Sequence, residues 1–127
     1  MNIEVIVEPN GEGIITGYTK GKYMNKEFVE MFINQIEDLM RTSDKEEYVQ
    51  DEAGMYLKVP YFEHLISEAR ELIKYGESKI ALENMLENLN EVSILLDESV
   101  VDLAHRAFGD QVTTYMERLL NKLVMHK

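Results

Sequence analysis

The sequence predicts a mainly α protein, an antiparallel helical bundle of four to five helices with a small N-terminal β-hairpin. Residues 9–21 hold four of the seven glycines and one of the two prolines, so the rest of the chain has few helix breakers. From residue 25 onward, apolar residues recur at three- and four-residue steps, which is the period of an amphipathic helix. A chain of 127 residues that is 45% hydrophobic fits a single domain. We expect residues 1–23 to form the hairpin and residues 25–127 the bundle.

The expected N-terminal hairpin rests on an alternating pattern. Ile3, Val5 and Val7 alternate with other residues, and Pro9-Asn10-Gly11 follows as a turn before Ile14-Ile15 opens a second β-like run. A two-stranded ribbon alone is marginally stable, so we expect it to lie against the helices or to pair with another edge.

The first helix should begin at Asn25, whose side chain can accept a hydrogen bond from the free amides of the first turn. Met24 and Val29 are placed to form a hydrophobic staple across that start. Its apolar face comprises Phe28, Val29, Phe32, Ile33, Ile36, Leu39 and Met40.

A polar, acidic loop is predicted over residues 42–52, followed by a short strand over residues 55–59. Proline is tolerated in the first turn of a helix and disfavours helix just before it. Pro60 therefore predicts the start of a second helix, and Gly76 predicts its end.

Three further helices are expected in the C-terminal half of the chain. The third should span about Glu77 to Val92, and the fourth should run from a cap at Asp97 to Gly109. Asp110 is the expected cap of the fifth. The apolar stripe of that last helix comprises Val112, Tyr115, Met116, Leu119, Leu120 and Leu123.

The composition limits the classes of function. Thirteen Lys and Arg against 24 Asp and Glu give a net charge of -11, and there is no Cys. Disulfides, thiolate zinc sites and a cysteine nucleophile are thereby excluded. A field of this sign repels phosphate, so we expect no direct nucleic acid or anionic membrane partner and favour a basic protein partner. The first twenty residues lack the basic start and apolar core of a signal peptide, and no run is long enough for a membrane span. A cytoplasmic location is expected.

Catalytic and cofactor patterns are weak, so we expect no enzyme, no cofactor and no metal. The glycines lack phosphate-loop spacing, and no serine lies in a nucleophile elbow. Two histidines have carboxylates at helical spacing: His64 with Glu68, and His105 with Asp102 and Glu98. Bundle metal sites draw their ligands from several helices, which favours a surface or helix-support role for both histidines.

The acidic residues are unevenly distributed. Nine acidic and four basic residues lie in residues 25–58, and seven and three in residues 59–91, while both ends are nearly balanced. Glu83, Glu87 and Glu91 are four residues apart, which places them on one stripe of the third helix. A second acidic element in the predicted loop comprises Asp44, Glu46, Glu47, Asp51 and Glu52. The simpler alternative is a solvated face that maintains solubility.

A resemblance to a known family rests on residues 76–109, which read GESKIALENMLENLNEVSILLDESVVDLAHRAFG. The matching features are Gly76-Glu77 at a helix start, Ala81-Leu82-Glu83, Asn88-Leu89, and the acidic cap Asp97-Glu98. This quarter of the chain resembles the small bacterial immunity proteins of polymorphic toxin and contact-dependent inhibition systems, in particular the MafI-like and colicin D immunity-like groups. The resemblance implies a cytoplasmic protein that binds and neutralises a cognate toxin domain, often a nuclease.

An acidic surface suits that role, because a nuclease carries a basic substrate groove that an acidic partner can occupy. The eight carboxylates of the stripe and the loop are the predicted partner-binding residues, and Tyr48, Tyr56 and Tyr61 are candidate aromatic anchors, with core packing as the alternative for each. A second hypothesis is a structural or regulatory helical interaction protein, which is a homo-oligomer if its last helix and its eight Met residues make the contact. Under the first hypothesis the free protein is a monomer or a weak dimer.

Overall fold

Five α-helices and one β-hairpin make up the part of the chain that the computed structural model describes, residues 24–125. The elements in chain order are α1 (Lys26–Arg41), β1 (Tyr48–Asp51), β2 (Gly54–Leu57), α2 (Lys58–Lys74), α3 (Ser78–Glu91), α4 (Glu98–Phe108), the 3₁₀ turn η2 (Gly109–Gln111) and α5 (Thr114–Leu123). The prediction of a mainly α fold with a small hairpin is confirmed. This hairpin, however, lies between α1 and α2, and the one predicted for residues 1–23 falls outside the described residues.

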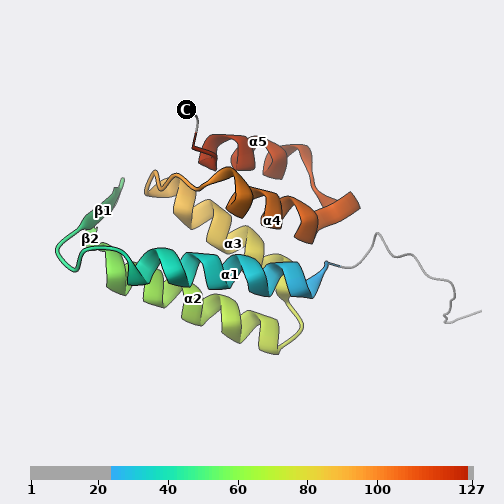
Figure 1. The fold of residues 1–127 in the computed structure, drawn as a ribbon, viewed down its shortest axis with the longest axis horizontal. Helices are drawn as coiled ribbons and strands as arrows, with labels where there is room; N and C mark the ends of the chain where they lie inside the picture. The colour runs from blue at the N-terminus through green and yellow to red at the C-terminus, as the bar shows by residue number, and fades with distance from the viewer. Residues whose placement is uncertain (1–23, 126–127) are drawn as a thin grey trace, which may run out of the picture.

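The helices are arranged in neighbouring pairs (Figure 1). α1 packs against α2 and α4, α2 against α3, and α5 against both α3 and α4. α1 and α2 run side by side in opposite directions, and the hairpin that joins them projects from one end of the bundle. Both strands of the hairpin are therefore near the end of α1 and the start of α2.

One hydrophobic core connects all five helices. Each helix contributes its apolar stripe at three- and four-residue spacing, which is the pattern read from the sequence. The buried members are Val29, Phe32, Ile33, Ile36, Phe62, Leu65, Ile66, Ala69, Ile73, Ala81, Leu82, Met85, Leu86, Leu89, Leu96, Val101, Ala104, Ala107, Phe108, Met116, Leu119, Leu120 and Leu123.

The start of α1 is the predicted one. The Asn25 side chain accepts a hydrogen bond from the Phe28 N–H at 3.4 Å. The Asn25 N–H in turn donates to the carbonyl of Ala107 at 3.0 Å, which attaches this helix start to the end of α4.

The boundary between the hairpin and α2 differs from the prediction. The strand ends at Leu57 and α2 begins at Lys58, so Val59 is helical and Pro60 is the third residue of the helix. Amides in the first turn have no partner within the helix, so a proline there removes no hydrogen bond. The helix can therefore begin two residues earlier than Pro60 indicates.

Helices α2 and α3 end in the same backbone motif. After α2, the N–H of Gly76 bonds to the Ile73 carbonyl and that of Glu77 to the Leu72 carbonyl; after α3, Ser93 and Ile94 bond to Asn90 and Leu89 in the same way. This motif places one residue in the left-handed region, where glycine is favoured. Gly76 has φ 80° and Ser93 has φ 59°, so Ser93 is a non-glycine residue in a position that suits glycine.

The predicted cap of the fifth helix is wrong. Asp110 lies in η2, and α5 begins at Thr114, with the Thr113 hydroxyl accepting from the Met116 N–H at 3.1 Å. Gly109, at φ 54° and ψ -127°, turns the chain after α4, and η2 follows before α5 can start. Asp97 does occupy the position before α4, as predicted, but its side chain makes no capping hydrogen bond.

Backbone hydrogen bonds join the segment before α4 to the chain at the end of α5. The Leu96 N–H donates to the Leu123 carbonyl at 2.7 Å, and the Met125 N–H donates to the Leu96 carbonyl at 2.8 Å. These two bonds attach Leu96 to both sides of the α5 C-terminus.

Among residues 24–125, no helix has the length and apolar character that crossing a bilayer requires.

Candidate protein-binding site

The hairpin carries two residues of the predicted acidic element, Asp51 at the end of β1 and Glu52 in the turn that follows. β1 and β2 pair antiparallel, with Tyr48 opposite Leu57 and Gln50 opposite Met55. The Asp51 carboxylate accepts hydrogen bonds from the N–H groups of Ala53 (2.8 Å) and Gly54 (3.0 Å), which shapes the turn. The prediction that residues 42–52 form a loop is wrong for Tyr48–Asp51, because burial of the Val49 side chain between exposed neighbours stabilises a strand there.

The two faces of the hairpin have different roles. On the inner face, Val49 lies opposite Tyr56, whose ring stacks on Tyr61 of α2 at 5.5 Å between centroids. On the outer face, Tyr48, Met55 and Leu57 are 59%, 61% and 41% exposed. Tyr61 therefore packs in the structure, whereas Tyr48 is free to contact a partner. The sequence did not reveal the apolar outer face, because it depends on the register of two strands.

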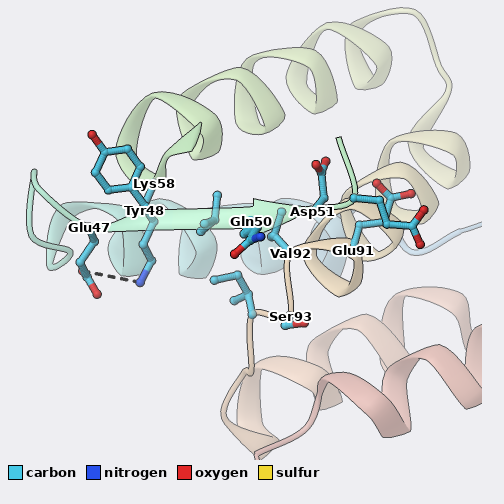
Figure 2. A pocket seen from close by; sticks show the side chains of 11 residues that line it. Glu47, Tyr48, Gln50, Asp51, Lys58, Glu91, Val92 and Ser93 are labelled. Carbon is cyan, nitrogen blue, oxygen red and sulfur yellow. Dashed lines mark ion pairs between the residues drawn. The ribbon is translucent and has the colours of Figure 1, made fainter. Parts of the chain in front are cut away.

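A groove of about 740 Å³ lies between β1 and the end of α3 (Figure 2). One wall is β1, and the other is the segment from Glu91 to Ile94. Among the described residues its acidic lining comprises Glu47, Asp51, Glu52 and Glu91, and the one cation among them, Lys58, lies 3.7 Å from the Glu47 carboxylate. An adjoining hollow of about 430 Å³ is lined by Asp51, Glu52, Ala53, Asn90 and Glu91.

The fold thus brings together three of the eight predicted partner-binding residues. Asp51 and Glu52 of the hairpin share both hollows with Glu91 at the end of α3, and Figure 2 places Asp51 and Glu91 at the same end of the groove. We call the surface formed by Asp51, Glu52 and Glu91 the acidic hairpin face; the exposed Tyr48 lies toward the other end of the groove (Figure 2).

The other loop carboxylates are outside this cluster. Glu47 accepts a hydrogen bond from the Asp44 N–H at 2.9 Å and pairs with Lys58, so it stabilises the turn after α1. Asp44 and Glu46 are exposed and line neither hollow.

The glutamate stripe of α3 is not uniformly exposed. Glu91 is exposed, but Glu83 and Glu87 are half-buried, and Glu83 is two turns, roughly 12 Å, from Glu91 along the helix. The hydroxyl of Tyr115 in α5 donates to the Glu87 carboxylate at 3.2 Å. The sequence placed Tyr115 in the buried stripe, whereas the structure leaves this residue 58% exposed.

The negative charge of this region acts on the tyrosines beside it. Partial burial, followed by the charges of Asp51 and Glu91, raises the pKa of Tyr56 and of Tyr61. The hydrogen bond to Glu87 and the charge of that carboxylate raise the pKa of Tyr115. These phenols therefore stay neutral at physiological pH and can donate hydrogen bonds.

Of the two histidine groupings read from the sequence, the structure forms one as a surface pair, and His105 is half-buried without an ion pair among the described residues. His64 Nε2 lies 3.4 Å from the Glu68 carboxylate, and both side chains are exposed. Asp102 pairs with Arg106 at 2.7 Å, next to His105. Within residues 24–125 there is no group of three or more histidine, aspartate or glutamate side chains that could hold a metal ion.

Comparisons with protein-family models, with curated proteins and with solved structures give no match to this chain. The resemblance of residues 76–109 to immunity proteins therefore stays a prediction.

Proposed function

We propose that this protein is a non-enzymatic immunity protein that binds a cognate bacterial toxin domain and blocks its basic active site. A nuclease is the class of toxin that best fits the proposal, because its substrate groove must attract phosphate. A cytoplasmic location, with the toxin as partner, is part of the same proposal.

The observation that carries the proposal is the clustering of Asp51, Glu52 and Glu91 from two separate elements around one groove. Acidic groups of this kind steer a basic partner and raise its association rate at low salt. Tyr48 and Met55 are exposed on the outer face of the same hairpin and belong to residue types that are enriched at the centre of protein interfaces. A solvated face alone needs no exposed apolar residues.

The alternative of self-association through the last helix has less support. Met116, Leu119, Leu120 and Leu123 of α5 are buried against the other helices. A dimer built on that stripe would have to expose the core, so the contact of a homo-oligomer would have to lie elsewhere.

Co-expression with a toxin tests the proposal. Immunity genes are expected directly beside a gene whose C-terminal domain is toxic, and the protein should restore growth of cells that express that domain. Binding of the two purified proteins should slow as salt rises, since steering is screened. Failure to protect against each neighbouring candidate would overturn the proposal.

Charge-reversal variants locate the surface. Glu52→Lys with Glu91→Lys should slow association and reduce its salt dependence. Glu30→Lys with Glu71→Lys changes the net charge equally at exposed residues outside the acidic hairpin face and serves as the control. Equal effects of the two pairs would assign the attraction to net charge and remove this face from the proposal.

A further inference from the structure

The outer edge of β1 carries unpaired backbone groups. The Lys58 N–H donates to the Glu47 carbonyl at 2.9 Å, which places Glu47 and Lys58 at a hydrogen-bonding position of the antiparallel ladder, although the Glu47 N–H itself donates to the Asp44 carbonyl. Hydrogen-bonded and non-hydrogen-bonded pairs alternate along such a ladder. Tyr48 and Gln50, opposite Leu57 and Met55, therefore direct their N–H and C=O groups away from β2. These four groups have no hydrogen-bond partner within residues 24–125.

This edge is one wall of the groove described above. Tyr48, Val49 and Gln50 line it together with Val92, Ser93 and Ile94 on the opposite wall (Figure 2). Within residues 24–125 the sheet has two strands, and the groove lies along the edge of β1 where a third strand would pair. An exposed strand edge is a template for pairing with another chain.

The negative charge of the groove favours basic side chains in any strand that pairs with this edge. Of the residues that the structure describes, four carboxylates and one cation, Lys58, line it, and Lys58 is paired with Glu47. Side chains of an extended segment alternate between the two faces of a sheet, so lysine or arginine at every second position would meet Asp51, Glu52 and Glu91 on one side.

Other occupants fit this charge less well. A second copy would bring its own β1 carboxylates against the same groove. Residues 1–23 carry Glu4, Glu8 and Glu12 against Lys20 and Lys22, so their charge does not complement the groove either. A basic segment of another protein does.

We propose that β1 is a docking edge, at which an extended basic segment of a partner protein adds a third strand to the hairpin. The inference rests on the proposed function in that the partner is the toxin domain. Main-chain hydrogen bonds to Tyr48 and Gln50 supply affinity, and the acidic lining selects basic side chains.

A peptide titration tests the pairing without knowledge of the partner. The probe is a capped peptide of alternating lysine and valine, long enough at about seven residues to span β1, added to the full-length protein. In the free protein the amides of Tyr48 and Gln50 should exchange with solvent quickly, and the Lys58 amide slowly. The peptide should protect the first two and leave Lys58 unchanged.

A matched peptide separates backbone pairing from charge attraction. Replacing its valines with proline keeps the charge and removes backbone donors, and we expect at least tenfold weaker binding. Equal binding of the two peptides, or no protection of Tyr48 and Gln50, would overturn the proposal. Protection of both amides before any peptide is added would also overturn it, because the edge would already be occupied by this chain or by a second copy.

A variant separates this proposal from the proposed function. In Gln50→Pro the lost N–H is one that the hairpin does not use, and prolines of this kind are tolerated on edge strands; Gln50→Thr is the control, and thermal unfolding monitors the fold of each. We expect Gln50→Pro to weaken toxin binding about tenfold. If Gln50→Pro inhibits the toxin as well as the unaltered protein while Glu52→Lys with Glu91→Lys does not, the edge pairing is wrong and the proposed function stands. If the peptide pairs with β1 but the protein neutralises no toxin, the proposed function is wrong and the edge pairing stands.

Discussion

The Tyr115 hydroxyl of α5 donates a hydrogen bond to the Glu87 carboxylate of α3 at 3.2 Å. This contact links the last helix to the acidic stripe, and it raises the pKa of the Tyr115 phenol. A group whose pKa is raised on folding contributes stability below its unfolded pKa and loses that contribution as the pH rises through the folded value.

Tyr115 should consequently titrate above the ordinary tyrosine pKa of about 10, and Glu87→Gln should bring it back toward that value. Nuclear magnetic resonance of the Tyr115 ring across alkaline pH measures both. Glu30→Gln, at an exposed position on α1, is the control. An unchanged titration in Glu87→Gln would show that Glu87 is not the cause.

The start of α5 gives a prediction about stability. Because the Thr113 hydroxyl caps the Met116 amide, Thr113→Ala should lower the free energy of unfolding by about 1 kcal/mol. Asp110, the cap that the sequence suggested, caps nothing in the structure, so Asp110→Ala should change stability by less than about 0.5 kcal/mol. Urea unfolding of the two variants compares them directly, and a larger loss in Asp110→Ala would contradict the assignment.

The left-handed residues at the ends of α2 and α3 form a matched pair. Ser93 has φ 59°, and glycine adopts this region without the steric cost that a side chain brings, so Ser93→Gly should stabilise the protein by about 0.5–1 kcal/mol. Gly76→Ser should destabilise it by a similar amount, although space around Gly76 is open. Thermal or urea unfolding measures both. The same sign for both substitutions would refute the backbone argument.

The ion pair between α1 and α2 predicts a pH dependence. Arg70 donates to both carboxylate oxygens of Glu37, at 3.1 and 3.3 Å, and this hydrogen bonding lowers the Glu37 pKa. A lowered pKa contributes stability above the unfolded value and loses it as the pH falls through the folded one. The unaltered protein should therefore lose more stability than Arg70→Gln as the pH falls below about 4.3. Arg118→Gln, at an exposed residue without an ion pair in residues 24–125, should follow the unaltered protein.

Two exposed tyrosines test the position of the partner. Tyr48 is 59% exposed on the hairpin, and Tyr75, 69% exposed, follows the end of α2, roughly 26 Å along that helix from its start at the hairpin. Under the proposed function, Tyr48→Ala should weaken toxin binding at least tenfold, or by about 1.4 kcal/mol. Tyr75→Ala should have no effect, and titration calorimetry with the toxin domain compares them. Equal losses would place the contact elsewhere.

Local sequence patterns predicted a helix correctly where its cap, its stop and its apolar stripe lie within or directly beside that helix. The cap at Asn25, the stop at Gly76 and the apolar stripes of α1 to α5 follow from residues a few positions apart, because helical hydrogen bonds and caps are local. The helix starts predicted at Asp110 and Pro60 were wrong because a residue two or three positions away begins each helix instead. α5 begins after Thr113, since the chain first turns through Gly109 and η2. α2 begins at Lys58, directly after β2 ends at Leu57.

The sequence by itself determined a mainly α protein with its negative charge concentrated in residues 25–91. Only the tertiary structure decided which of those carboxylates lie side by side. Asp51 and Glu52 meet Glu91 because the hairpin folds across the end of α3, whereas Glu47 is held by Lys58 and Glu87 by Tyr115. A charge count gives the size of the field, but grooves and strand edges arise from contacts between residues far apart in the chain, and no local pattern encodes those contacts.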